Sequence, residues 1–257
     1  MLRALLIFLI CRQVVCASFG FAYLDDYPPY LFKEGAPSRF ALEDLFAETA
    51  ANGSGYYKEG ALEIELSETA DTQRAYRFLI KDGGQILMKV EGFDQPALPS
   101  SVYRADLDNN GLDDLMVISW SRGVGLAVLL GSVDIFMKKA PESYDHIHYE
   151  SVAAGPEDFV DMDQDGRAEV IMPSYYMGNK HNYFAYAVYE IAGGRLVNVS
   201  SRYKGFPKFI WYTHKPNDKQ TTHLTKAEKA GHIREIESKI KYRHILLESG
   251  LSGAEGN

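Results

Sequence analysis

Cysteine is nearly absent from this sequence, which contains two in 257 residues, Cys11 and Cys16. If the N-terminal segment that holds both is removed, the chain has no thiol, which excludes disulfides, thiol catalysis and thiolate metal sites. Basic clusters are also missing ahead of the C-terminal region, and the formal net charge is −8. Because a nucleic-acid-binding face needs clustered Lys and Arg to neutralise phosphates, no nucleic-acid partner is expected.

The N-terminal apolar run, residues 4–10, is too short to span a bilayer as a helix. Arg3 precedes it, and small or apolar residues at 15–17 stand where signal peptidase reads a chain. These features predict a signal peptide over residues 1–17, cleavage before Ser18 and no transmembrane span afterwards. The expected localisation is extracytoplasmic, either periplasmic or secreted.

Two other interpretations of this segment stay open. It could form a buried N-terminal strand or helix. It could also carry a lipid on Cys16, but Val14 and Val15 precede this cysteine, where a lipobox has a small residue directly before it. The cleaved signal peptide is therefore the favoured reading.

Local catalytic motifs are lacking as well. The sequence has no Gly-x-Ser-x-Gly, no His-Glu-x-x-His and no Walker loop. No catalytic residue is predicted, and a non-catalytic protein is favoured. Catalysis by dispersed carboxylates needs no local motif, so it stays open.

Alternation of apolar and polar residues with period two predicts a mainly β, antiparallel fold from about residue 60 onward. Gly and Asp/Asn clusters separate many of the runs, as expected for turns between strands. The runs lie at 62–66, 85–90, 115–119, 125–130, 144–152, 168–172, 183–191 and 195–199, with a further candidate at 206–213.

Two helices are expected outside the β region. Apolar residues recur at helical spacing over 42–50, with Ser38 as a candidate cap and Asn52-Gly53 as a stop, which predicts a short N-terminal helix. A capping-box pattern at 225–228 and isoleucines at helical spacing predict a basic, amphipathic C-terminal helix over about 226–242.

These signals divide the chain into four parts. The signal peptide covers residues 1–17, and an N-terminal extension with the short helix covers 18–59. A β domain follows over 60–215, and residues 216–257 hold the C-terminal helix and a tail that is expected to be disordered from 249.

An internal repeat lies within the β domain, since residues 102–119 align with residues 157–174. Each copy contains an acidic loop, at 106–114 and at 161–169, followed by an apolar strand. The stretch 60–92 could be a degenerate earlier unit without the loop.

The two loops have the residue order of a calcium site. Calcium takes six to eight oxygens at about 2.3–2.6 Å, and alternate side chains of a tight loop can supply them. Glycines at 111 and 166 allow the sharp bend. The alternative is an Asp/Asn-rich turn without an ion; an EF-hand does not fit, because strands flank the loops and apolar residues occupy position twelve. The predicted ligands are Asp106, Asp108, Asn110, Asp114 and the Leu112 carbonyl, and Asp161, Asp163, Asp165, Glu169 and the Arg167 carbonyl.

The pattern Asp-x-Asp-x-Asn/Asp-Gly-x-x-Asp/Glu followed by an apolar strand resembles the FG-GAP repeat. This repeat carries the calcium loops of integrin α-subunit β-propellers and of many secreted bacterial proteins. The resemblance covers about residues 100–200; Pro-Ser-Tyr at 173–175 replaces the usual Gly-Ala-Pro, and no Phe-Gly pair precedes either loop. Two or three units are too few to close a ring, so the resemblance implies an incomplete, propeller-like stack of antiparallel sheets.

The sequence thus favours an exported calcium-binding β-repeat protein with two structural Ca²⁺ ions, acting as a non-catalytic binding or scaffold module for a protein or glycan partner. The alternative is a secreted hydrolase of glycans or phosphoesters with structural calcium. The second loop is expected to bind more tightly, because it has four negative side chains against three. Weaker signals are the His146-Ile147-His148 pair and aromatic segments near 175–183 and 211–214, which could contact a partner.

Overall fold

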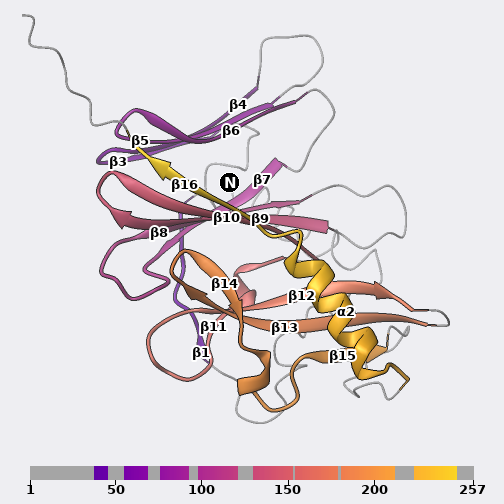
Figure 1. Cartoon of the computed structure of the whole chain (residues 1–257). Helices are drawn as coiled ribbons and strands as arrows, with labels where there is room; N and C mark the ends of the chain where they lie inside the picture. Colours follow the sequence, from indigo (N-terminus) through magenta and orange to yellow (C-terminus); the bar gives the residue numbers. More distant parts are fainter. Residues whose placement is uncertain are drawn as a thin grey trace, which may run out of the picture.

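The computed structural model describes residues 38–45, 55–68, 76–92, 98–120, 130–152, 154–178, 181–211 and 223–247. Within these residues the chain forms three antiparallel sheets that are stacked as layers (Figure 1). The expectation of a mainly β, antiparallel fold is confirmed. The signal peptide and the C-terminal tail lie outside the described residues.

The first sheet is a meander of β3 (Gly55–Glu59), β4 (Leu62–Glu68), β5 (Tyr76–Asp82) and β6 (Gln85–Gly92), in that order. Glycines with positive φ form its tight turns, Gly60 between β3 and β4 and Gly83-Gly84 between β5 and β6. This sheet occupies the stretch expected to be a degenerate unit, beginning at residue 55 instead of 60.

The second sheet is built on the first acidic repeat. It contains β7 (Leu98–Ala105), β8 (Asp114–Trp120), β9 (Leu130–Ala140) and β10 (Ser143–Val152). Two strands from elsewhere extend its edges, with β2 (Glu43–Asp44) on β7 and β16 (Lys241–Leu246) on β10.

The third sheet repeats this plan with β11 (Phe159–Asp161), β12 (Glu169–Met177), β13 (Asn182–Ala192) and β14 (Arg195–Asn198). β1 (Ser38–Arg39) pairs with β11, and β15 (Lys208–Trp211) pairs with β13. A short 3₁₀ helix, Pro156–Asp158, directly precedes β11, and a second, Ser200–Arg202, lies between β14 and β15. In both repeats the acidic loop joins the first strand of the meander to the second.

The second sheet is the middle layer, so its central strands β8 and β9 are buried on both faces, whereas the edge strands β2 and β16 are largely exposed. On β8, Met116 and Ile118 belong to the core shared with the third sheet, whereas Leu115 and Val117 belong to the core shared with the first. Burial on both faces explains why this strand is continuously apolar instead of alternating.

One α-helix occurs in the described residues, α2 (Lys226–Glu237), which lies beside β12 and β13 (Figure 1). The predicted capping box is present: the Glu228 backbone N–H donates to Thr225 Oγ1 (3.2 Å), and the Thr225 backbone N–H donates to Glu228 Oε2 (2.8 Å). Ile233 is buried in the core and Ile236 partly so. Within the described residues no helix is long and apolar enough to cross a membrane.

The predicted C-terminal boundary of this helix was wrong. The helix ends at 237 rather than near 242, and residues 241–246 form β16, which pairs with β10 from Lys241–His148 to Leu246–Ser143. Ile240 fits a helical period but reaches the core from the turn between the two elements. The free edge of β10 offers backbone hydrogen bonds that a longer helix would leave unmade.

The predicted N-terminal helix was wrong where it is described. Ser38–Arg39 pairs with Val160 and Asp161 of β11, and Glu43–Asp44 pairs with β7. Both segments form backbone hydrogen bonds to sheet edges, and these bonds stabilise the extended conformation more than a weak helical period stabilises a helix. Residues 46–54, the rest of that prediction, lie outside the described residues.

Candidate metal centre

The two acidic loops follow the same backbone path. At the fourth position Asn109 has φ 56° and Gln164 has φ 63°, and at the sixth position Gly111 has φ 83° and Gly166 has φ 82°. A left-handed conformation is uncommon for any residue with a side chain, so two copies at equivalent positions indicate one loop structure used twice.

The first aspartate of each loop organises the turn. Asp106 accepts hydrogen bonds from the backbone N–H groups of Asn110 (2.9 Å) and Gly111 (2.7 Å). Asp161 accepts from the equivalent groups of Asp165 (3.1 Å) and Gly166 (3.2 Å). Each carboxylate therefore bends the following four or five residues back toward itself.

The last acidic residue of each loop starts the next strand and is buried. Asp114 is 1% exposed and accepts from the backbone N–H groups of Leu107 (2.8 Å) and Lys138 (2.7 Å). Glu169 is 2% exposed and accepts from the Met162 N–H (2.7 Å). These bonds fix both carboxylates at the base of their loops.

Both buried carboxyl groups bind protons more readily than free ones. Burial raises the pKa of Asp114 to about 7, and the negative charges of Asp108 and Asp106 act in the same direction. Burial likewise raises the pKa of Glu169 to about 7, to which Asp163 and Asp165 also contribute. Without a cation the loops therefore hold charge that the protein stabilises poorly.

Three of the predicted side chains converge in each loop. Carboxylate oxygens that lie within 4.8 Å of one another are supplied by Asp106, Asp108 and Asp114 in the first loop, and by Asp161, Asp163 and Glu169 in the second. Asp108 Oδ1 is buried and has no hydrogen-bond partner among the residues that the structure describes. Such a set of hard, anionic oxygens fits a divalent cation of the calcium type.

The fifth-position side chains make other contacts. Asn110 Oδ1 accepts from the Leu112 N–H (2.8 Å), and the Asn110 amide donates to the Lys138 carbonyl (2.9 Å). Asp165 Oδ1 accepts from the Arg167 N–H (2.9 Å), and its other oxygen pairs with the Arg167 guanidinium. Both residues shape the turn. Asp165 lies outside the converging set of carboxylates in its loop, whereas Asn110 remains a predicted ligand. The carbonyl oxygens of Leu112 and Arg167 remain predicted ligands.

A lysine that the loop pattern does not predict lies beside the first site. Lys139 Nζ is 2.6 Å from Asp108 Oδ2. Among the described residues, no Lys or Arg forms an ion pair with Asp161, Asp163 or Glu169 of the second loop. Lys139 comes from β9, and no signal within the loop could have revealed it.

The two loops contact each other. The Ala168 backbone N–H of the second loop donates to the Leu107 carbonyl of the first (2.8 Å). A Cβ on Gly166 would lie 3.1 Å from the Asn109 side-chain nitrogen. Both this close contact and the positive φ of Gly166 therefore favour glycine at this position.

The histidine pair His146 and His148 contacts a buried carboxylate, that of Asp134. His146 Nε2 (2.8 Å) and His148 Nδ1 (2.9 Å) both contact Asp134 Oδ1. Burial alone would raise the pKa of Asp134, but the two imidazole hydrogen bonds outweigh it and hold this pKa below its usual value. Asp134 is a partner that sequence spacing did not identify.

The aromatic segments contribute partly to the core. Tyr183 is buried, and Tyr176 packs against Tyr183 and His232. His181 packs beside Trp211, with ring centroids 4.4 Å apart and ring planes inclined by 58°. Tyr212 and His214 lie outside the described residues.

No family model matches the chain, and the searches of curated proteins and of solved structures give no match either. The geometry of the two loops is therefore the basis for inferring which ion they bind.

Proposed function

We propose that this protein is an exported calcium-binding β-repeat protein whose two ions are structural and whose sheets serve as a binding or scaffold module. The observation that carries the proposal is the acidic loop built twice, with the same backbone path and three converging carboxylates in each copy. The resemblance of both loops to FG-GAP repeats supports the same reading.

Calcium is favoured over magnesium by the character of the ligands. Each loop offers several carboxylate oxygens from one short, backbone-braced turn, a set that suits the large and variable coordination shell of calcium. Magnesium requires near-ideal octahedral geometry and keeps several waters, so it should bind more weakly here.

For an exported protein, a modest affinity for calcium is sufficient. Extracellular calcium modules bind at about 10⁻⁴–10⁻³ M, close to the calcium concentration outside cells. A site of this strength would be filled after export. The N-terminal signal in the sequence is the basis for this localisation, and the partner is proposed to be a protein or a glycan.

The second loop is proposed to be the tighter site. Its three converging carboxylates have no cationic side chain paired to them within the described residues, whereas Asp108 of the first loop pairs with Lys139. A cation entering the first loop meets this ammonium group, which lowers its affinity by like-charge repulsion.

Thermal unfolding with added calcium tests the proposal. At 100 times Kd one site adds about 2.7 kcal/mol of stability, which corresponds to a rise in Tm on the order of 5–10 °C for a chain of this size. Calcium-depleted protein is titrated in parallel with calcium and with magnesium. No shift, or an equal shift with both ions, would contradict the proposal.

A matched pair of variants assigns the effect to the loops. Asp163→Asn removes a converging carboxylate of the second loop and should reduce the shift. Asp113→Asn removes the same charge from an exposed first-loop residue outside the converging set, and should leave the shift unchanged.

A further inference from the structure

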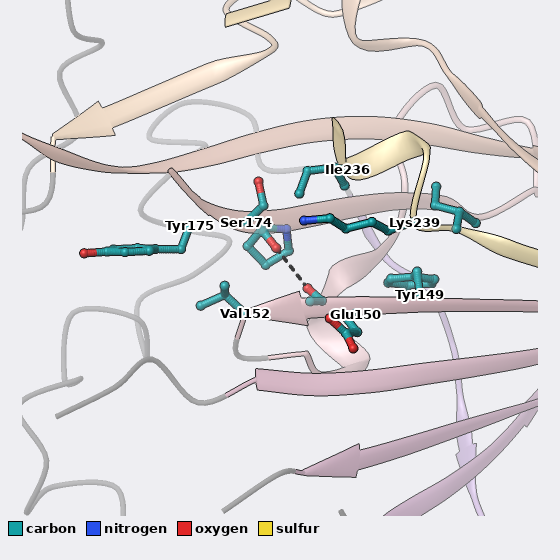
Figure 2. A pocket seen from close by; sticks show the side chains of 10 residues that line it. Tyr149, Glu150, Val152, Ser174, Tyr175, Ile236 and Lys239 are labelled. Carbon is teal, nitrogen blue, oxygen red and sulfur yellow. Dashed lines mark hydrogen bonds between the residues drawn. The ribbon is translucent and has the colours of Figure 1, made fainter. Parts of the chain in front are cut away.

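A pocket lies between β10, β12 and the end of α2 (Figure 2), and the residues that line it do not belong to either acidic loop. Its volume is about 260 Å³. Val152, Pro173, Ile236 and Ile240 give it largely apolar walls. A concave apolar site with a few polar groups is the usual form of a small-molecule site, and this volume suits a small ligand.

Ser174 lines this pocket and contacts a histidine from another element. Its Oγ lies 2.9 Å from Nε2 of His232 on α2. Ser174 is 7% exposed and His232 is 5% exposed. The other acceptor near this hydroxyl, the Ala185 carbonyl, is 3.4 Å away, a long distance for a hydrogen bond to oxygen.

The surroundings of His232 favour the neutral form of its imidazole. The ring packs beside Tyr176 (centroids 4.9 Å apart) and Phe209 (6.0 Å). Burial lowers the pKa of His232. A neutral imidazole at hydrogen-bond distance from a serine hydroxyl is the arrangement in which histidine can act as a general base.

Two further polar groups belong to the pocket. The Tyr149 hydroxyl is buried and has no hydrogen-bond partner within the described residues. Lys239 pairs with Glu235 (2.8 Å), and Figure 2 shows its side chain extending into the pocket toward Ser174. A cationic group beside a serine can stabilise negative charge that develops on a substrate oxygen.

We propose that Ser174 and His232 form a nucleophile–base pair that hydrolyses small carboxylic esters whose acyl group fits the apolar pocket. Ser174 Oγ bonds to the ester carbonyl carbon while its proton passes to His232 Nε2. The ester C–O bond then breaks, and the alcohol leaves with that proton. Water attacks the acyl-serine by the same proton transfer, which releases the carboxylic acid and restores the serine.

This activity goes beyond the calcium role and does not depend on it. With this activity, the alternative function of a secreted hydrolase would rest on a serine nucleophile and not on dispersed carboxylates. The competing explanation is that the Ser174–His232 hydrogen bond only attaches α2 to the third sheet. That explanation predicts an effect on stability and none on reactivity.

Labelling with a fluorophosphonate probe separates the two explanations. The full-length protein is incubated with the probe, and the adduct is mapped by mass spectrometry. Hydrolysis of p-nitrophenyl butyrate is followed in parallel for wild type, Ser174→Ala, His232→Gln and Ser200→Ala. Ser200 is the matched control, because it is a buried serine outside the residues that line the pocket, and its Oγ accepts from the Val188 N–H (2.9 Å) instead of contacting an imidazole.

The proposal expects an adduct on Ser174, loss of labelling and turnover in Ser174→Ala, and wild-type labelling and turnover in Ser200→Ala. Loss of the general base in His232→Gln should lower turnover by roughly 100-fold. An unlabelled wild-type protein, or an adduct on any other residue, would overturn it. The adduct site is read from the wild-type protein, so the test stands even where a variant fails to fold.

Discussion

Calcium-free protein should lose stability as the pH rises from about 5 to 7. The pKa of Asp114 is 3.8 in its ordinary state and about 7 in the folded protein. The folded state therefore binds a proton that the unfolded state has released across this range. The free energy of unfolding falls as pH rises through the interval and levels off about one pH unit above the folded-state pKa.

The magnitude follows from the size of the pKa shift. The slope is about 1.4 kcal/mol per pH unit while the folded state holds the extra proton, so the two units between pH 5 and 7 give a change on the order of 2–3 kcal/mol for Asp114. Glu169, whose pKa is also raised to about 7, acts in the same direction. For a chain of this size the Asp114 contribution corresponds to a fall in Tm of about 5–10 °C.

The assay is thermal unfolding between pH 5 and 8, in calcium-free buffer and again with saturating calcium. A bound cation favours the ionised carboxylates, so calcium should remove most of the slope. Burial of His232 lowers its pKa and gives a slope of opposite sign below its usual value of 6.5. The difference between wild type and Asp114→Asn isolates the carboxylate, and Asp113→Asn is the control that should keep the wild-type slope.

Two results would refute this reasoning. One is a calcium-free slope that is the same in wild type and Asp114→Asn. The other is a slope that calcium leaves unchanged, because the buried carboxylates would then not contact the ion.

Three further outcomes follow from the contacts. Asp163→Asn should reduce calorimetric calcium stoichiometry from two to one, whereas Asp165→Asn should keep two; equal losses would show that the fifth position ligates. Lys139→Met should tighten the first site several-fold in calcium titrations, and an unchanged Kd would exclude the ammonium as a competitor. Asp134→Asn should lower the free energy of unfolding in urea by about 2–3 kcal/mol, since it disturbs two hydrogen bonds to histidines. Because the pKa of Asp134 is lowered in the folded state, part of the wild-type stability should also be lost below pH 4, as Asp134 becomes protonated. An unchanged free energy of unfolding in Asp134→Asn would contradict this reasoning.

Sequence periodicity identified the strands whose burial is one-sided or continuous, such as β4, β8 and β13. It missed β3, β5, β7, β11 and most of β9; in β7 proline and serine interrupt the pattern, and in β9 serine and lysine do. It also continued a helix through β16. The identity of β16 depends on the free edge of β10, which lies about 100 residues earlier in the chain, so a local pattern cannot show it.

The candidate metal site was predictable to the extent that its chemistry is local. Its converging carboxylates lie within nine successive residues, and their order alone indicates the ion. Asp114, however, is held partly by the Lys138 N–H from β9, and Lys139 from the same strand neutralises Asp108. The sequence therefore predicts that a site exists but not how strongly it binds. Ser174 and His232 are 58 residues apart, and only the packing of α2 on β12 brings them together, so no motif search could have found that pair.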